Sequence, residues 1–392
     1  MISFEEALEI VLTNAVTLGE EQAGLESAAG RVLSRDVYSD MDMPPFDKSA
    51  VDGFACRMGN IVEGSEQQII ETIPAGMVPA KSVGVGECSR IMTGGMLPRG
   101  ADTVIMVEDT VSTSAGTIKF LKKIETGNIC YRAENIKTGQ KVLDQGTLLQ
   151  PAHLAVLASV GNTEVWVSCQ PKIGIISTGN ELVEPNQKPA GAQIRNSNAW
   201  PLYAQARQFA AGCSYFGIAG DSPEELKDKI MMGLVASDII ILTGGVSMGD
   251  FDFVPAAMES LGAGIFFKSV AIQPGRPTVF ARYGNKFIFG LPGNPVSSFV
   301  LFELMVKPFV LKMMGCDEQF RNLSLPMGVD YSRIKSDRKS VIPVVIENSI
   351  VYPLEYHGSA HINAYINANG MMIMDIGQTE IKKGEPANVR PL

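Results

Sequence analysis

Cysteine and histidine are scarce in this chain of 392 residues, which contains six of the first and three of the second. The cysteines are scattered and lack the Cys-x-x-Cys spacing, which argues against a zinc centre and against a disulfide framework. His357 and His361 are four residues apart, but the intervening Gly358 and the lack of a third ligand argue against a metal role. A P-loop lysine and a Gly-x-Ser-x-Gly elbow are also missing, which disfavours NTPase and serine-hydrolase chemistry.

Positive charge and long apolar runs are lacking as well. The formal net charge of −9 argues against broad binding to nucleic acid or to anionic membranes. No stretch approaches the roughly 20 apolar residues that span a bilayer, and the first residues do not resemble a signal peptide. We therefore expect a cytoplasmic protein that binds neither nucleic acid nor a membrane, with room for roughly two to four domains.

Three short apolar segments, rich in Ile or Phe, each run into a loop that contains glycine. These segments are typical of buried parallel strands, and they lie at 172–176, 239–243 and 286–290. The pattern between and after them predicts helices at about 197–211, 222–236, 253–261 and 297–313. Strands that alternate with helices predict a doubly wound α/β sheet, in which the loops at the carboxyl ends of the strands form one ligand crevice.

The loop after 239–243 carries the clearest chemical signal. Glycines at 244, 245 and 249 would let the backbone bring N–H groups to a phosphate, while Asp250 and Asp252 would hold a hard cation beside it. A strand-to-helix turn without any ligand is the alternative.

Two other loops contain residues that fit helix starts. Ser222, followed by Pro223 and Glu225, is explained by helix initiation alone. Ser297 and Ser298 are expected to cap a helix whose N-terminus would also attract a phosphate.

The remainder of the chain has a different pattern. An amphipathic helix capped by Ser3 is expected near the N-terminus, and another helix is expected at 151–161. Two adjacent prolines at 44–45 precede a loop with Asp47, Lys48, Ser49 and Asp52, which fits either a ligand-presenting loop or an interdomain hinge. Residues 61–130 and the chain after about 320 show short alternating segments, and the latter are typical of a small β-barrel.

Several motifs occur in a fixed order and resemble those of the MoeA family over the whole chain. They are Ser-Ala-Val-Asp-Gly-Phe-Ala at 49–55, Arg-Ile-Met-Thr-Gly at 90–94, Pro-Arg-Gly-Ala-Asp at 98–102, Ser-Thr-Gly-Asn-Glu-Leu at 177–182, Gly-Gly-Val-Ser-Met-Gly at 244–249, Gln-Pro-Gly-Arg-Pro at 273–277 and Leu-Pro-Gly-Asn-Pro at 291–295. The resemblance implies a multidomain α/β and β fold. Its parts would be an elongated linker domain at 1–46 and 131–170, an inserted β domain at 47–130, a doubly wound molybdopterin-binding α/β domain at 171–320 and a C-terminal β-barrel domain at 321–392.

The resemblance also implies an activity. Members of the family are molybdenum insertases that convert adenylylated molybdopterin and molybdate to molybdenum cofactor and AMP, with Mg²⁺ or a similar divalent ion. They form head-to-tail homodimers, with the site between the α/β domain of one subunit and the inserted domain of the other. The upstream molybdopterin adenylyltransferase is a candidate partner.

Carried over by motif, the catalytic roles fall on Asp52, Thr93, Glu181 and Asp252. Metal-binding roles fall on Glu181, Asp221, Asp250 and Asp252. Substrate contacts fall on Ser177, Thr178, Gly179, Gly244, Gly245, Ser247, Gly249, Lys268, Arg276, Pro292, Asn294, Pro295 and Ser297.

The sequence departs from the family pattern at Asn135, Asn180, Ser269 and Gln273. Asn135 and Asn180 stand where the family has a carboxylate, and Gln273 stands where it has a lysine, whereas Arg276 keeps the positive charge. These changes leave three hypotheses open: a working molybdenum insertase, a paralogue that handles tungstate or another pterin nucleotide, and a non-catalytic binding or scaffold protein of the same fold.

Overall fold

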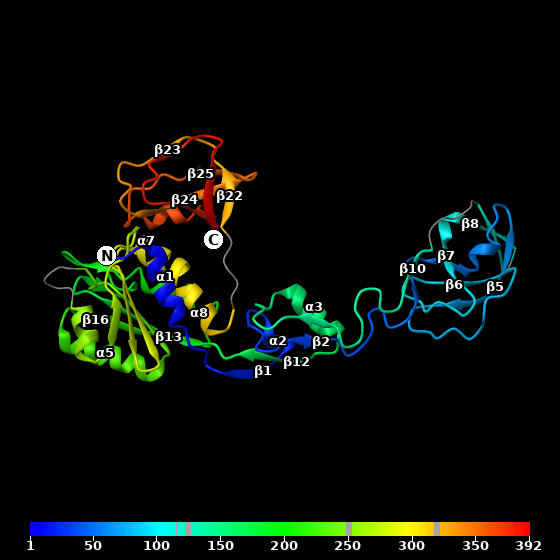
Figure 1. Ribbon diagram of the computed structural model, residues 1–392, viewed down its shortest axis with the longest axis horizontal. Coiled ribbons are helices and arrows are strands. Elements are labelled where there is room, and N and C mark those ends of the chain that lie inside the picture. Colours follow the sequence, from blue (N-terminus) through cyan, green and yellow to red (C-terminus); the bar gives the residue numbers. More distant parts are fainter. Residues whose placement is uncertain (115, 122–126, 248–252, 317–321) are drawn as a thin grey trace. The chain divides into compact units, whose positions relative to one another are not determined.

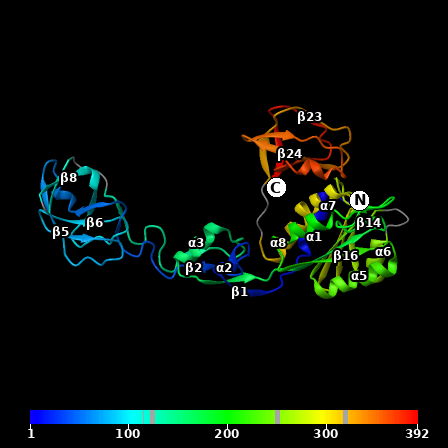
Figure 2. The ribbon, with the colours of Figure 1, turned by 180° about the vertical axis from the view of Figure 1, so that it is seen from behind.

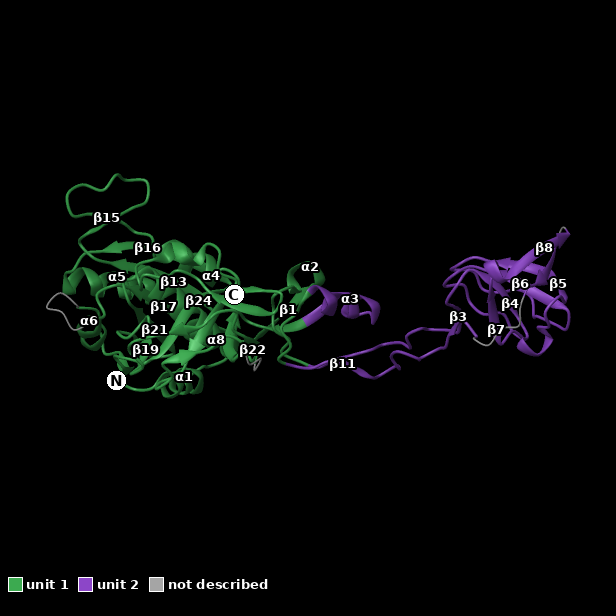
Figure 3. Cartoon of the chain, turned by 90° about the horizontal axis from the view of Figure 1, so that it is seen from above, with its two compact units in different colours: residues 1–35, 146–150, 166–392 green, residues 36–145, 151–165 purple. Residues whose placement is uncertain are grey.

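The computed structural model describes residues 1–114, 116–121, 127–247, 253–316 and 322–392. The chain forms two compact units, which Figure 3 shows in different colours. Unit 1 comprises residues 1–35, 146–150 and 166–392, and unit 2 comprises residues 36–145 and 151–165. Within the described ranges, no helix is both long enough and apolar enough to cross a membrane.

Unit 2 is built on a six-stranded sheet with the order β7-β4-β6-β5-β9-β8. Its strands pair antiparallel except for β5 and β6, which are parallel. Successive residues of β4 enter different apolar clusters, with Phe54 and Cys56 in one and Ala55 in the other, because side chains alternate between the faces of a strand. The strands are β4 (Gly53–Cys56), β5 (Glu66–Ile73), β6 (Glu87–Ile91), β7 (Thr103–Met106), β8 (Thr110–Ser114) and β9 (Thr117–Phe120).

Most of the remaining elements of unit 2 lie before and after this sheet in the sequence, while two 3-10 turns lie between its strands. Two short antiparallel pairs join strands that are distant along the chain, β3 with β10 and β2 with β11. Asp42 ties the same two stretches together, because it accepts hydrogen bonds from the Thr138 backbone and from Arg132. The elements are β2 (Val37–Tyr38), β3 (Lys48–Ser49), β10 (Ile129–Cys130), β11 (Lys141–Leu143), α3 (Pro151–Ser159), and two 3-10 turns, η1 (Met58–Asn60) and η2 (Val107–Asp109).

Unit 1 contains the predicted α/β sheet, and its order is β16-β13-β17-β21-β20-β18. The first four strands are parallel, whereas β20 and β18 pair antiparallel at one edge. The strands are β13 (Lys172–Thr178), β16 (Gly212–Ala219), β17 (Ile239–Thr243), β18 (Gly264–Phe267), β20 (Val279–Tyr283) and β21 (Lys286–Leu291). The doubly wound α/β fold expected from the sequence is therefore confirmed, with an antiparallel edge added.

Both faces of this sheet are covered by helices, as Figures 1 and 2 show. Ile239 and Ile241 join the cluster that includes α1, α4, α7 and α8, while Ile240 and Leu242 join the cluster with α5 and α6. A strand that is apolar at every position therefore packs on both sides. The helices are α1 (Phe4–Thr13), α4 (Ala199–Ala206), α5 (Pro223–Ala236), α6 (Val254–Ser260), α7 (Pro295–Leu301) and α8 (Lys307–Met313), with the π-helical turn η3 (Phe302–Val306) between the last two.

The helix starts test the capping predictions directly. Ser3 and Ser222 accept hydrogen bonds from the backbone N–H groups of Glu6 and Glu225, as expected of N-caps. The prediction that Ser297 and Ser298 cap a helix is wrong, because α7 begins at Pro295, whose fixed φ suits the first helical position.

The C-terminal part of unit 1 is a β structure with its own core. A sheet of order β19-β24-β26-β28-β22 carries β25 on β24, and β23 pairs with β27. Its core includes Met327, Val344 and Met372. The elements are β19 (Ile272–Gln273), β22 (Leu323–Pro326), β23 (Tyr331–Ser332), β24 (Lys339–Glu347), β25 (Ile350–Pro353), η4 (Ile362–Tyr365), β26 (Gly370–Met374), β27 (Glu380–Ile381) and β28 (Pro386–Pro391).

The other elements of unit 1 are short. They are β1 (Glu20–Gly24) and α2 (Leu25–Ala28), then β14 (Leu182–Val183) and β15 (Ile194–Arg195), while β12 (Glu164–Ser168) spans the boundary with unit 2.

Candidate functional site

The loops after β13, β17 and β21 converge on one pocket of about 230 Å³. The three strands are parallel, and β17 lies between the other two, so their carboxyl ends are side by side. The structure thus brings together the three loops that the sequence assigned to one crevice. The pocket is lined by Thr178, Gly179, Glu181, Leu182, Ile194, Asn198, Asp221, Thr243, Gly244, Gly245 and Gly293.

Glycine is required in this pocket because the loops approach each other closely. Gly244 has a φ of 97°, and a Cβ added there would lie 2.5 Å from the carbonyl oxygen of Thr178. Its N–H donates to the carbonyl of Leu291 at 3.0 Å, and the N–H of Gly179 donates to the carbonyl of Ala219 at 3.1 Å. Both N–H groups are therefore bonded within the protein in this structure, and the two glycines shape the pocket. Their predicted contacts with the substrate stay predictions.

Two carboxylates form the acidic side of the pocket. Asp221 accepts a hydrogen bond from the N–H of Asn180 at 3.1 Å, and the side-chain oxygen of Asn180 accepts one from the N–H of Asp221 at the same distance. The Glu181 carboxylate lies against Gly179, since a Cβ added to that glycine would be 2.5 Å from Glu181 Oε2. Asn180, a departure from the family pattern, thus joins the turn that holds Asp221 beside the pocket.

The structure describes only two of the four predicted metal-binding residues. Gly249, Asp250 and Asp252 lie outside the described residues, so their roles stay predictions. In the part of the chain that the structure describes, no three His, Cys, Asp or Glu side chains are grouped closely enough to bind a metal ion. Glu181 and Asp221 are the two predicted ligands that line the pocket.

Asn198 is a pocket residue that sequence reasoning missed. Its amide nitrogen donates to Thr243 Oγ1 at 2.9 Å and to the carbonyl oxygen of Gly293 at 2.7 Å. It therefore connects the end of β17 to the loop after β21. Asn198 directly precedes α4 and looks in the sequence like an N-cap, yet its side chain makes no capping hydrogen bond. Its partners are distant along the chain, so no local pattern indicates this contact.

Several predicted substrate residues do not line this pocket. Ser177 is fully buried, and its hydroxyl donates to Asn196 Oδ1 at 3.0 Å. Asn294 donates to the hydroxyl of Ser359 at 2.8 Å, a contact with the C-terminal part that the sequence did not predict. The others are Ser247, which is exposed, Pro292 and Ser297, which are buried, and Pro295, which is half-buried.

The predicted cations lie elsewhere in unit 1. Lys268 pairs with Glu259 at 2.6 Å, and neither it nor the exposed Arg276 lines the pocket. Gln273 instead lines a second cavity of about 560 Å³ together with Lys335 and Arg333. The Arg333 guanidinium donates to backbone carbonyls, including that of Gln378 at 2.7 Å, so its role there is structural.

Asp52 and Thr93 form the predicted pair in unit 2. Thr93 follows β6, and both its backbone N–H and its hydroxyl donate to Asp52 Oδ1, at 2.6 and 2.8 Å. These two hydrogen bonds, together with the charge of Arg90, hold the pKa of the Asp52 carboxyl below its usual range. The residue after Asp52 must be glycine, because a Cβ on Gly53 would lie 1.8 Å from the carbonyl oxygen of Ile105.

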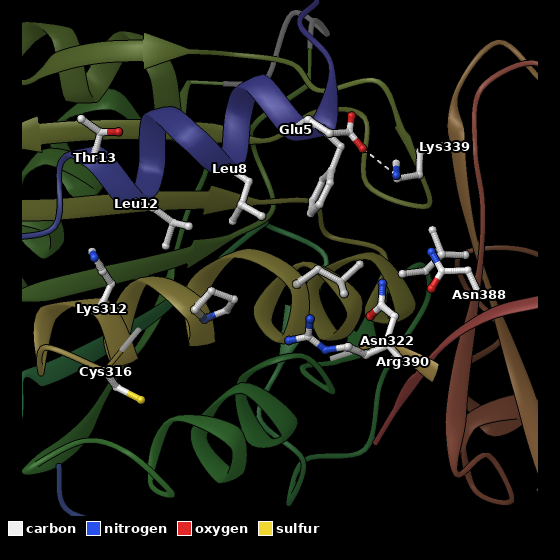
Figure 4. A pocket seen from close by; sticks show the side chains of 14 residues that line it. Glu5, Leu8, Leu12, Thr13, Lys312, Cys316, Asn322, Lys339, Asn388 and Arg390 are labelled. Atoms are coloured by element: carbon white, nitrogen blue, oxygen red, sulfur yellow. Dashed lines mark ion pairs between the residues drawn. The ribbon is translucent and has the colours of Figure 1, made fainter. Parts of the chain in front are cut away.

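A larger cavity of about 730 Å³ lies elsewhere in unit 1 and contains none of the predicted residues. Figure 4 shows apolar side chains of α1 and the α8 region along it, with Lys312, Lys339 and Arg390 among its polar groups. Lys339 pairs there with Glu5 at 2.6 Å.

Known families match nearly all of the chain. The MoeA N-terminal region (domain I and II) matches residues 2–161, and a probable molybdopterin binding domain matches residues 174–312. The MoeA C-terminal region (domain IV) matches residues 330–392.

Individual relatives agree with these matches. A molybdopterin molybdenumtransferase of Staphylococcus epidermidis is 33% identical over 99% of this chain and 95% of the relative, and one of Staphylococcus aureus is 32% identical with the same coverage. The crystal structure of a molybdopterin biosynthesis MoeA protein from Pyrococcus horikoshii OT3 has a TM-score of 0.84 at 29% identity and covers both chains completely. With its three-loop pocket and its β domains, the chain therefore belongs to the MoeA family of molybdopterin molybdenumtransferases.

Proposed function

We propose that this chain is a molybdenum insertase that converts adenylylated molybdopterin and molybdate to molybdenum cofactor and AMP. The observation that carries the proposal is the pocket in which Glu181 and Asp221 share one cavity with the glycine loops at 244–245 and 293. A phosphoanhydride needs a cation to offset its negative charge and closely fitting backbone around its oxygens. The names of the full-length staphylococcal relatives support the same function.

A divalent ion is part of the proposal. The described groups fit Mg²⁺, because this ion takes oxygen ligands and the pocket is lined by the carboxylate residues Glu181 and Asp221. Glu181 and Asp221 would hold it, with Asp250 and Asp252 as further proposed ligands. When bound, the ion would neutralise charge that develops on the phosphate oxygens.

The pocket holds part of the substrate in this proposal. Its volume of about 230 Å³ lies below the ~300 Å³ at which small-molecule sites usually begin. A head-to-tail homodimer would complete it by placing the Asp52–Thr93 pair of one subunit over the pocket of the other.

We also propose that the chain divides into four domains. They are a linker domain (1–46 and 131–170), an inserted β domain (47–130), a molybdopterin-binding α/β domain (171–320) and a C-terminal β-barrel domain (321–392).

Asp52 has a defined task in such a site. Two donors from Thr93 keep its carboxylate ionised, so it suits cation binding and hydrogen-bond acceptance better than proton donation. Glu181 is exposed and lines the pocket of unit 1. In the proposed dimer the two residues would contact the substrate from different subunits.

A second candidate function rests on Gln273. This amide lines the cavity that also contains Lys335, at a position where the MoeA pattern has a lysine. The cavity therefore has one cation fewer for an oxyanion. A paralogue that handles another pterin nucleotide would fit that difference, and one that handles tungstate stays an equal alternative, because molybdate and tungstate have the same charge and nearly the same shape.

The function is tested with purified protein, adenylylated molybdopterin, molybdate and Mg²⁺, with AMP measured over time. Asp52→Ala and Glu181→Ala are expected to lower turnover by about 100-fold or more, since a lost electrostatic contact to a transition state costs this much. Lys268→Ala tests separately a predicted substrate contact that does not line the pocket, and it is expected to lower turnover less than either carboxylate variant. Wild-type turnover in both carboxylate variants would refute the assignment.

A further inference from the structure

A small arm of the chain, residues 182–195, forms one wall of the pocket, and Glu181 lies at its base. β14 and β15 pair over two residues each, and the chain between them extends from unit 1, as Figure 3 shows. The carbonyl of Glu181 accepts a hydrogen bond from the Ile194 N–H at 2.8 Å, so Glu181 belongs to this pairing. Leu182 and Ile194 of the arm line the pocket. Two residue pairs are too few to fix such an arm by themselves.

Buried and half-buried side chains tie the arm to the sheet. Asn196, which is 1% exposed, follows β15 directly, and its Oδ1 accepts from the Ser177 hydroxyl at the end of β13 at 3.0 Å. Its amide nitrogen donates to Tyr215 Oη on the edge strand β16 at 2.7 Å. The Tyr215 hydroxyl then donates to Glu184 Oε1 at 2.8 Å. Glu184 directly follows β14 and Asn196 directly follows β15, so the Tyr215 hydroxyl bonds to both ends of the arm.

The direction of this hydrogen-bond relay is fixed by chemistry. The Asn196 amide nitrogen can only donate, so the Tyr215 oxygen accepts from it and uses its single proton toward Glu184. Burial and the nearby Glu184 carboxylate raise the pKa of Tyr215, and the hydroxyl therefore remains protonated. Phenylalanine would preserve the ring, which packs beside Trp200 with ring centroids 5.8 Å apart, but it would break both bonds.

We infer that Tyr215 is a positioning residue, which sets the location of the Glu181 carboxylate through the arm. Neither Tyr215 nor Asn196 lines the pocket, so neither acts by touching the substrate there. The inference rests on the proposed function, because it assumes that Glu181 serves AMP release. Loss of the relay lets the arm shift, and a displacement of about 1 Å at a reacting group is enough to reduce the rate substantially.

The test is a double-mutant cycle on AMP release with the full-length protein. Tyr215→Phe is expected to lower kcat about tenfold with little change in KM. Glu184→Leu is expected to act similarly, while Glu184→Gln, which keeps an oxygen acceptor, should retain most of the rate. Tyr203→Phe removes a hydroxyl from another ring that packs beside Trp200, outside the relay, and is expected to leave the rate unchanged.

The cycle with Glu181→Gln decides between a positioning role and a general structural one. If Tyr215 acts through Glu181, Tyr215→Phe adds almost no further loss in the Glu181→Gln background. A full tenfold loss in that background, or no loss in the wild-type background, overturns the inference. If Glu181→Gln alone keeps full turnover, the proposed role of Glu181 fails first, which separates that failure from a failure of the relay.

Discussion

Mixing two inactive variants tests whether the site is shared between subunits. Asp52 belongs to unit 2, whereas Glu181 belongs to unit 1. In a head-to-tail dimer, each site would take Asp52 from one subunit and Glu181 from the other. A heterodimer of Asp52→Ala and Glu181→Ala would then contain one site with both substitutions and one site with none.

The size of the effect follows from counting sites. Random pairing of equal amounts makes about half of the dimers heterodimers, each with one intact site of two, so the mixture should recover about a quarter of the wild-type rate. The variants are co-expressed with different tags, and AMP release is measured on the pool and on the isolated heterodimer. The heterodimer should show about half of the wild-type rate.

A matched control uses wild type mixed with the Asp52→Ala, Glu181→Ala double variant. With shared sites, both sites of that heterodimer lose one residue, and only the wild-type homodimers, about a quarter of the total, stay active. With sites inside single subunits, this control would keep about half of the rate, and the mixture of single variants would stay inactive. That second pattern would refute the shared site.

Three further variants, two single and one double, test residues of the pocket and the departures from the family pattern. Asn198→Ala removes two hydrogen bonds that join the end of β17 to the loop after β21 and should cost about 1–3 kcal/mol of unfolding free energy. Denaturant unfolding and AMP release are measured in parallel, and unchanged values for both would contradict its bridging role. Asn180→Asp adds a carboxylate beside Asp221 and should lower the Mg²⁺ concentration that gives half-maximal turnover. An unchanged Mg²⁺ titration would argue against an ion at this position. Asn135→Asp combined with Gln273→Lys leaves the net charge unchanged and should raise molybdate-dependent turnover if the chain is a specialised paralogue. Unchanged activity and metal preference would count against that alternative.

Sequence patterns were sufficient for the parts of the fold that depend on local chemistry. The apolar strands β13, β17 and β21 and the caps at Ser3 and Ser222 depend on burial and on contacts three residues away. The convergence of their loops then follows from the rules of α/β sheets, whereas the strand order and the antiparallel edge strands β20 and β18 were not predicted. Pro295 shows where this reasoning erred, because its preference for a helix start outweighed that of the serines after it.

Contacts between distant segments could not be predicted in the same way. Asn198 binds residues 45 and 95 positions away, and Asn294 binds Ser359 at a separation of 65. The internal hydrogen bond of the Gly244 N–H also depends on the adjacent strand β21 rather than on the loop itself. Such partners are set by the packed sheet, and a single sequence carries no local signal for them.

The central claim, molybdenum insertion coupled to AMP release, is tested most directly by stoichiometry in the wild-type protein. AMP and protein-bound molybdenum cofactor are measured in the same reaction with adenylylated molybdopterin, Mg²⁺ and either molybdate or tungstate. The account predicts one AMP for each molybdenum incorporated, with little AMP released when molybdate is omitted. AMP release without incorporation of molybdenum, or no AMP release with either oxyanion, would contradict it.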